Sequence, residues 1–199
     1  MWERLLQTIV FIDGQNLFHL AKNSWEHTGS SHYEYPSYDV EKVAQTLVNR
    51  VPGRVLAEIR FYTGVKDARQ SYHWHGFWTN KIRRMLSLGI TVYRGRVNPG
   101  GQEKGVDVKL AVDLVRLTYE QAYDAAVIVS QDTDFGPAVH LAREVAKSQG
   151  RTLSIDSCFP YDGSYGSDRG IPGTRWVHID QATFDSWLDP RDYRPPPLP

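Results

Sequence analysis

Two patterns of hydrophobic positions alternate along the chain. Short apolar runs rich in β-branched and aromatic residues are typical of strands buried on both faces. They occur at residues 8–13, 54–64, 90–97, 124–130 and 151–159. Segments that favour helices follow them, at residues 15–23, 40–51, 79–89, 106–121 and 136–150. Strands that alternate with helices indicate an α/β fold, in which a parallel sheet with right-handed crossovers carries helices on both faces.

The remaining segments lack these patterns. Residues 24–38 are polar and aromatic and are predicted to form a loop, and residues 159–175, rich in Gly, Tyr, Asp and Ser, a mobile loop. A last short strand and helix are expected between residues 176 and 188. The tail 189–199 is rich in proline, cannot continue a helix or strand, and is expected to be frayed or extended. We therefore predict a single domain over residues 1–188.

Composition narrows the class of protein. The 199 residues, 41% of them hydrophobic, suffice for one domain with a full core. Lys plus Arg equals Asp plus Glu, so net charge says nothing about an acidic partner. The lone cysteine, Cys158, excludes a disulfide framework and a cysteine-based zinc site, and it fits a reducing compartment. The segment MWERLLQTIVFIDG lacks the features of a signal peptide, and no apolar run is as long as a membrane span. We expect a cytoplasmic protein with no membrane role.

Acidic residues stand where two of the predicted strands end. Asp13 ends the first strand, and Asp132 and Asp134 follow the fourth, in AAVIVSQDTDFG. Open parallel sheets place their sites outside the carboxyl ends of the strands, where the strand order reverses. If the order is 3-2-1-4-5, the first and fourth strands are neighbours. The three acids would then lie together although they are far apart in the sequence.

A fourth acid is expected to join them from the helix at 106–121. Asp107 stands in its first turn, with apolar residues at offsets of three, four and seven, so it should point towards the sheet. Asp113, at an offset of six, should be solvated and able to pair with Lys109.

Each acid also has an ordinary structural explanation. Asp13 is a candidate turn or cap residue, Asp134 a candidate helix cap, and Asp107 an acid favoured by the helix dipole. Four carboxylates in one crevice, however, repel one another and need a compensating cation. Without His or Cys ligands at zinc spacing, the natural occupant is Mg²⁺ or Mn²⁺, which takes oxygen ligands.

Three segments together resemble a known family. VFIDGQNL, KGVDVKLAVDL and AVIVSQDTDFGPAV are similar in order and spacing to the signature segments of the NYN domain, a branch of the PIN-like nuclease superfamily. The resemblance covers about residues 8–157 and leaves 158–188 as a C-terminal extension. It implies a Rossmann-like PIN fold with sheet order 3-2-1-4-5 and metal-dependent cleavage of phosphodiester bonds, most often in RNA.

The resemblance also assigns roles to residues. It implies a metal site formed by Asp13, Asp107, Asp132 and Asp134, with Asn16 near the metal or the scissile phosphate. The chain departs from the family pattern at two positions, with Gln131 where the family has Gly and Thr133 where it has Ser. A side chain at position 131 could narrow the approach to the metal or change substrate contacts, but both neighbouring acids are kept.

An RNA substrate also requires cationic and stacking groups. Five basic residues fall within sixteen positions and are candidate RNA contacts: Lys81, Arg83, Arg84, Arg94 and Arg96. Lys104, just before Asp107, is a candidate phosphate contact or an ordinary loop lysine. The aromatic segment SYHWHGFW at 71–78 offers either rings for bases or core residues. The loop at 163–170 is a candidate substrate flap or a loop without function.

The leading hypothesis is therefore a metal-dependent endoribonuclease that hydrolyses single-stranded or structured RNA, with Asp13 or Asp134 orienting the attacking water. A homo-oligomer or a regulatory protein partner is compatible with the sequence. One alternative is a PIN-like module that binds RNA or protein without cleaving. Another is a metal-dependent phosphatase, although the Asp-x-Asp segment expected after its first strand is absent, because Gly14 and Gln15 follow Asp13.

Overall fold

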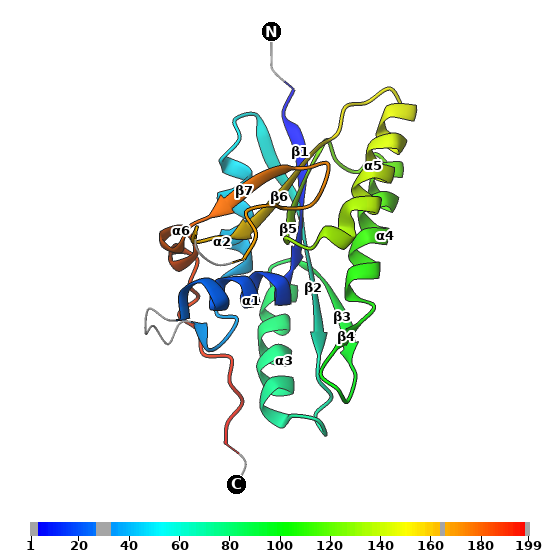
Figure 1. Ribbon diagram of the computed structural model, residues 1–199. Coiled ribbons are helices and arrows are strands. Elements are labelled where there is room, and N and C mark those ends of the chain that lie inside the picture. Colours follow the sequence, from blue (N-terminus) through cyan, green and yellow to red (C-terminus); the bar gives the residue numbers. More distant parts are fainter. Residues whose placement is uncertain (1–3, 27–32, 164–165, 198–199) are drawn as a thin grey trace.

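A seven-stranded sheet forms the centre of the molecule (Figure 1). The computed structural model describes residues 4–26, 33–163 and 166–197. The strand order is β4-β3-β2-β1-β5-β6-β7, and every neighbouring pair is parallel except β3 with β4. The strands are β1 (Leu6–Asp13), β2 (Arg54–Val65), β3 (Thr91–Val97), β4 (Glu103–Lys104), β5 (Ala125–Val129), β6 (Ser154–Pro160) and β7 (Arg175–Ile179). The predicted order of five strands is confirmed as β3-β2-β1-β5-β6, and β4 and β7 extend its two edges.

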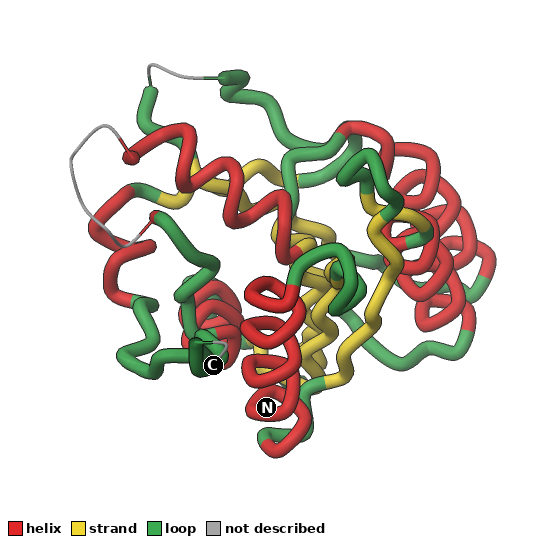
Figure 2. The backbone as a smooth tube through the Cα atoms, turned by 90° about the horizontal axis from the view of Figure 1, so that it is seen from below, coloured by secondary structure: helices red, strands yellow, loops and turns green. Residues whose placement is uncertain are grey.

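Helices cover both faces of the sheet, as Figure 2 shows in a view from below. They are α1 (Gly14–Trp25), α2 (Val40–Asn49), α3 (Tyr72–Ser87), α4 (Val106–Tyr119), α5 (Gly136–Ser148) and α6 (Gln181–Ser186). Residues of α1, α2, α3 and α6 share one hydrophobic core, and residues of α4 and α5 share the other. No helix in the described residues is long and apolar enough to cross a membrane.

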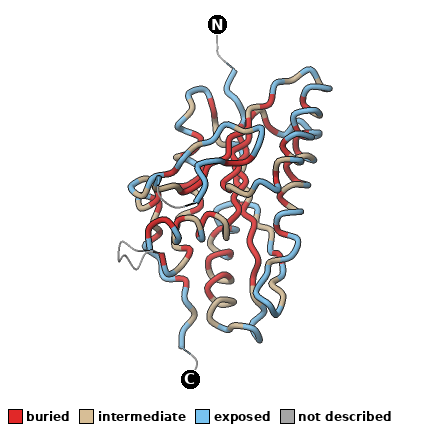
Figure 3. The backbone as a smooth tube through the Cα atoms, in the orientation of Figure 1, coloured by how far each residue is buried: buried red, intermediate tan, exposed pale blue. Residues whose placement is uncertain are grey.

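The two central strands are buried on both faces (Figure 3). Every residue of β5 is buried, and so is β1 from Thr8 to Asp13. Apolar side chains therefore alternate between the two cores along each strand: Val10 and Ile12 belong to one, Ile9 and Phe11 to the other. This double burial explains the continuous apolar runs in the sequence, and it brings the carboxyl ends of β1 and β5 side by side.

Helix α3 runs from Tyr72 to Ser87, so the predicted helical segment 79–89 forms its C-terminal part, and the helix begins further upstream. The Ser71 hydroxyl caps the helix by accepting a hydrogen bond from the backbone N–H of Trp74 at 3.3 Å. The aromatic segment thus lies on the helix, where Phe77 and Trp78 face the core. The run of aromatic residues obscured the helical period in the sequence, because the half-buried Trp74 lies next to the buried face of α3 and widens the apolar pattern.

The C-terminal tail lies along α3 as an extended segment. The Tyr193 hydroxyl donates to Asp189 at 2.6 Å, and the Asn80 amide of α3 donates to the Tyr193 carbonyl at 3.1 Å. Pro195 packs against Gly76, where a side chain on the helix would collide with the proline ring. The predicted loops at 24–38 and 159–175 and the tail include residues 27–32, 164–165 and 198–199, which lie outside the described residues.

Candidate active site

Asp13 is the last residue of β1 and the N-cap of α1. Its carboxylate accepts hydrogen bonds from the backbone N–H of Asn16 at 3.0 Å and from the Ser130 hydroxyl at 3.4 Å. The residue is 5% exposed. Burial, and to a smaller extent the negative charges of Asp107 and Asp132, raise the pKa of Asp13 to about 7, against the lowering effect of the hydrogen bonds.

The segment after β5 brings Asp132 and Asp134 to the same end of the sheet. The Asp132 carboxylate caps a short 3-10 helix (Thr133–Phe135) by accepting from the backbone N–H of Asp134 at 2.9 Å. The side-chain oxygen of Asn16 accepts from the backbone N–H of Gln131 at 3.0 Å. Asn16 therefore joins the end of β1 to the segment that carries these acids, and this contact fixes the position of one acidic segment relative to the other.

Asp107 enters from the first turn of α4. The preceding Gly105 has a φ of +81°, which lets the chain turn from β4 into the helix. Asp107 is exposed, and its pKa is raised by partial desolvation and then by the charges of Asp132 and Asp134. The charge of Asp107 in turn raises the pKa of Asp13. Asp13, Asp107, Asp132 and Asp134, which we call the acid cluster, are thus within electrostatic range of one another.

The predicted burial of the two acids on α4 was wrong. Asp107 is exposed, whereas Asp113 is 1% exposed. Asp113 accepts from Lys109 at 2.5 Å, as predicted, and from the Tyr62 hydroxyl at 2.9 Å. Burial raises the pKa of Asp113, but these hydrogen bonds outweigh it and hold the pKa below its ordinary value. The buried stripe of α4 includes Leu110 and Leu117, so position 113 lies within it at offsets of three and four.

Glu103 is a fifth acid that the sequence did not reveal. Its carboxylate accepts from the backbone N–H of Gly64 in β2. Burial, and to a smaller extent the charges of Asp13 and Asp107, raise the pKa of Glu103 to about 7. Glu103 belongs to the two-residue strand β4, which exists only because it pairs with β3. No local pattern marks so short a strand, and only the nearby KGVD segment hinted that the region matters.

The donor set suits a hard divalent cation. All the acids are oxygen donors, and Asp13 is a buried carboxylate without a cationic partner in the described residues. Within those residues, no three Asp, Glu, His or Cys side chains stand close enough together to hold one ion. Mg²⁺ is usually bound through one or two carboxylates and keeps several waters. The cluster therefore fits an ion held by few direct ligands, but not a closed protein cage.

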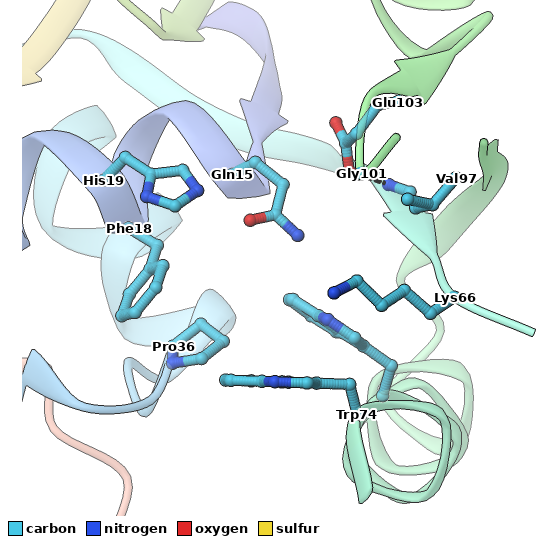
Figure 4. A pocket seen from close by; sticks show the side chains of 11 residues that line it. Gln15, Phe18, His19, Pro36, Lys66, Trp74, Val97, Gly101 and Glu103 are labelled. Atoms are coloured by element: carbon cyan, nitrogen blue, oxygen red, sulfur yellow. Dashed lines mark hydrogen bonds between the residues drawn. The ribbon is translucent and has the colours of Figure 1, made fainter. Parts of the chain in front are cut away.

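A hollow of about 440 Å³ adjoins the acid cluster (Figure 4). Its wall contains the aromatic rings of Phe18, Trp74 and Trp78, and Gln15 and Glu103 connect it to the acids. The Gln15 side chain is near enough to Glu103 to lower the pKa of its carboxyl group. The remaining lining residues are His19, Pro36, Gly64, Lys66, Val97 and Gly101. We call this hollow the aromatic pocket.

A second hollow of about 330 Å³ shares Lys66 and Val97 with the first. Its other lining residues are Val65, Asp67, Gln70, His75, Arg94 and Arg96. We call it the basic hollow. It combines two predicted RNA contacts with Lys66, which the sequence analysis missed because Lys66 stands outside the basic segment at 81–96.

The other predicted RNA contacts have different positions. Lys81 is 2% exposed and donates to the carbonyls of Pro36 and Tyr38 at 2.5 and 2.6 Å. Its assignment to substrate was wrong, because its ammonium group is enclosed in the core. Arg83 and Arg84 lie on α3 and line neither hollow, whereas Lys104 is exposed on β4.

Gln131, the departure from the family pattern, holds the C-terminal loop. Its side-chain amide donates to the Arg169 carbonyl at 2.9 Å and also to the Ser167 carbonyl. Segment 166–170 is thereby attached next to the acid cluster, although it lies beyond the NYN-like segments in the sequence. Ser164 and Tyr165, within the predicted flap, lie outside the described residues.

The fold and the acids define a Rossmann-like α/β protein with an acidic centre at the switch point of its sheet. The model of the NYN domain matches residues 7–149, and the chain belongs to this family of the PIN-like nuclease superfamily. A family of this kind indicates a nuclease-like function.

Among solved structures, a protein of unknown function from Vibrio parahaemolyticus is similar, with a TM-score of 0.57 and 13% sequence identity. The similarity covers 91% of this chain and 97% of the other, and it shows a shared fold. No curated protein matches the chain.

Proposed function

We propose that this protein is a metal-dependent endoribonuclease that hydrolyses RNA phosphodiester bonds at the acid cluster. The supporting observation is that the buried Asp13 and its neighbour Asp107 have no cationic partner among the described residues. After burial, the charges of Asp107 and Asp132 raise the pKa of Asp13, and those of Asp132 and Asp134 raise the pKa of Asp107. Such an arrangement is costly for a purely structural role. It is favourable once a cation binds.

The cluster of Asp13, Asp107, Asp132 and Asp134 would hold Mg²⁺ or Mn²⁺ with one or two carboxylates as direct ligands and the others through its bound waters. The ion would supply an activated water and polarise the phosphoryl oxygen. Asn16 acts by holding the segment of Asp132 against the end of β1. Glu103 adds a carboxylate that attracts the cation from the β4 side. RNA is the proposed partner, and Arg94, Arg96 and Lys104 are the proposed contacts for its phosphates.

The test is cleavage of labelled single-stranded RNA in Mn²⁺, Mg²⁺ or EDTA. We expect cleavage in either metal and none in EDTA. Asp13→Asn and Asp132→Asn should each reduce the rate at least about 100-fold, since each removes charge from the metal site but keeps the shape and capping ability of the side chain.

Asp124→Asn is the matched control, because Asp124 lies at the opposite end of β5 and pairs with Arg4 at 3.0 Å. It should cleave like the wild type. Cleavage that survives in the folded Asp13→Asn and Asp132→Asn proteins would contradict the proposal.

One observation favours a second candidate, a module that binds RNA without cleaving it. No three of the described acids converge closely enough to hold one ion. A binding module would retain RNA equally in EDTA and in Mn²⁺ and leave every tested substrate intact. An intact RNA together with unchanged binding on addition of metal would therefore select this candidate.

A further inference from the structure

The aromatic pocket is linked to the acid cluster through Gln15 and Glu103, and none of the four acids lines it. Gln15 lies between Asp13 and Asn16 in the first turn of α1, and its side chain points into the pocket (Figure 4). Glu103 borders the same space from β4. A nucleotide whose phosphate reached the acids would therefore have its neighbouring group at the mouth of this pocket.

The apolar wall offers a rigid stacking surface. Trp74 is half-buried, so part of its ring is accessible, while Trp78 is 3% exposed and belongs to the core. Three aromatic neighbours hold the Trp74 ring, with centroids of Tyr35, Phe77 and His73 at 5.4, 5.7 and 5.8 Å. A ring fixed in this way loses little conformational entropy when a flat ligand stacks on it.

Polar groups around the pocket match the edge of a base. Figure 4 shows Gln15 and Lys66 directing their polar ends into the space that Trp74 borders. Within the described residues, the Lys66 ammonium group forms no ion pair or side-chain hydrogen bond, and His19 adds an imidazole. Amide, ammonium and imidazole groups supply the donors and acceptors that read base edges. The volume of about 440 Å³ is within the range of small-ligand pockets.

The basic hollow indicates the direction in which a bound RNA strand would continue away from the acid cluster. It shares Lys66 and Val97 with the aromatic pocket and adds Arg94 and Arg96 from β3. These arginines stand two residues apart on one strand, so their side chains project from the same face. Together with Lys66 they form a cationic surface on the side of the pocket towards β3.

We propose that the aromatic pocket binds one unpaired base of an RNA strand beside the cleaved phosphate, and that the basic hollow binds the next phosphate. This inference rests on the proposed ribonuclease function and specifies its substrate: single-stranded RNA, selected by the base in the pocket. A base in a duplex is stacked and paired, so it could not enter.

Binding is measured separately from cleavage, by fluorescence anisotropy of short labelled homopolymeric RNAs in EDTA. Trp74→Ala should raise the dissociation constant for RNA roughly 5- to 100-fold, which is the usual effect of removing one base-stacking ring. Trp74→Phe, which keeps a ring, should retain most of the affinity. Lys66→Gln should weaken binding and reduce the slope of log K against log salt by about one.

The matched control is Tyr119→Ala, because Tyr119 is an aromatic residue that is 71% exposed on α4 and lines neither hollow. It should bind RNA like the wild type. Circular dichroism and thermal melting verify that each variant is folded, and the rescue by Trp74→Phe separates loss of stacking from loss of structure.

Sequencing the ends produced from a random RNA pool in Mn²⁺ supplies the second readout. The wild type should prefer one base at a fixed position next to the cut, and Trp74→Ala should lose that preference. Normal binding by both Trp74→Ala and Lys66→Gln would overturn the pocket proposal while cleavage still stands. Weakened binding without any cleavage would support the pocket and reject the nuclease. Failure of the wild type to bind any of the RNAs would overturn the pocket proposal.

Discussion

Two groups of buried acids in this protein differ in what neutralises them. Asp156 is 2% exposed and accepts hydrogen bonds from Arg54 at 2.5 Å and from Arg175 at 2.7 Å. Asp113 is bound by Lys109 and Tyr62. Asp13 is 5% exposed and Glu103 is half-buried, yet neither has an ion-pair partner within the described part of the chain.

The pKa values follow this difference. That of Asp113 lies below its ordinary value despite burial, whereas those of Asp13 and Glu103 are raised to about 7 by burial and by neighbouring charges. Burial of an acid alone therefore does not identify a functional site. The absence of internal compensation distinguishes the acid cluster, because it leaves a negative charge that an external cation can neutralise.

The largest expected effect is a loss of stability when Asp156, a buried acid with cationic partners, is replaced. Asp156→Ala removes the partner of two arginines and leaves the buried Arg54 guanidinium without its carboxylate, so the free energy of unfolding should fall by about 3–5 kcal/mol. Asp13→Asn should change it by less than about 1 kcal/mol, because asparagine also caps helices. Denaturation in urea, in EDTA at pH 7, measures both. Similar losses in the two variants would refute the distinction between the groups.

A smaller effect on stability, which depends on pH, is expected for Asp113. Because its folded pKa is lowered, the unfolded state takes up the proton at higher pH than the folded state. The stability it contributes is complete above its unfolded pKa, about 3.9, and is lost as pH falls through the lower folded pKa. Asp113→Asn should be less stable at pH 7 by about 1–3 kcal/mol, since two hydrogen bonds to a charged group weaken.

The measurement for Asp113 is a series of urea titrations between pH 7 and pH 2. The stability difference between Asp113→Asn and the wild type should shrink as the pH falls below about 4. Glu120→Gln, which changes an exposed acid at the C-cap of the same helix, serves as the control and should follow the wild type throughout. A difference that stays constant over the whole range would show that the carboxylate charge of Asp113 does not contribute.

The smallest expected effect concerns the acid cluster and the stabilisation of the folded protein by a bound metal ion. Mn²⁺ at about ten times its dissociation constant should stabilise the wild type by about 1.4 kcal/mol, which raises the melting temperature by about 3–6 °C for a chain of this size. Asp13→Asn and Asp132→Asn should lose the shift, whereas Asp124→Asn should keep it. Scanning calorimetry with and without metal provides this readout without any substrate. An equal shift in all four proteins would place the ion elsewhere.

The sequence predicted the parts of the site that depend on long, regular elements. Continuous apolar runs identified β1 and β5, and the acids that follow them had to meet once those strands were neighbours. The resemblance to the NYN domain supplied the order, which the structure confirms for five strands. Asp13 and Asp132 are therefore brought together by backbone topology, which the sequence encodes strongly.

Other features depend on tertiary contacts that no local pattern records. Glu103 could not be found because β4 is created by its partner strand. Lys81 was misassigned because counting basic residues ignores burial, and Lys66 was missed because only the fold brings it to Trp74. The burial of Asp107 and Asp113 was predicted the wrong way round because the offsets were counted from Asp107. The buried stripe of α4 instead starts at Val106 and continues at Leu110.

The pairing of β1 with β5 also has a consequence for synthesis of the protein. Asp13 is synthesised more than a hundred residues before its neighbour β5 and the acids Asp132 and Asp134. The complete acid cluster cannot exist in a nascent chain shorter than about the NYN segment, however well its first helices have folded. The centre that we propose for RNA cleavage is therefore assembled only after β5 and the segment that follows it have been synthesised.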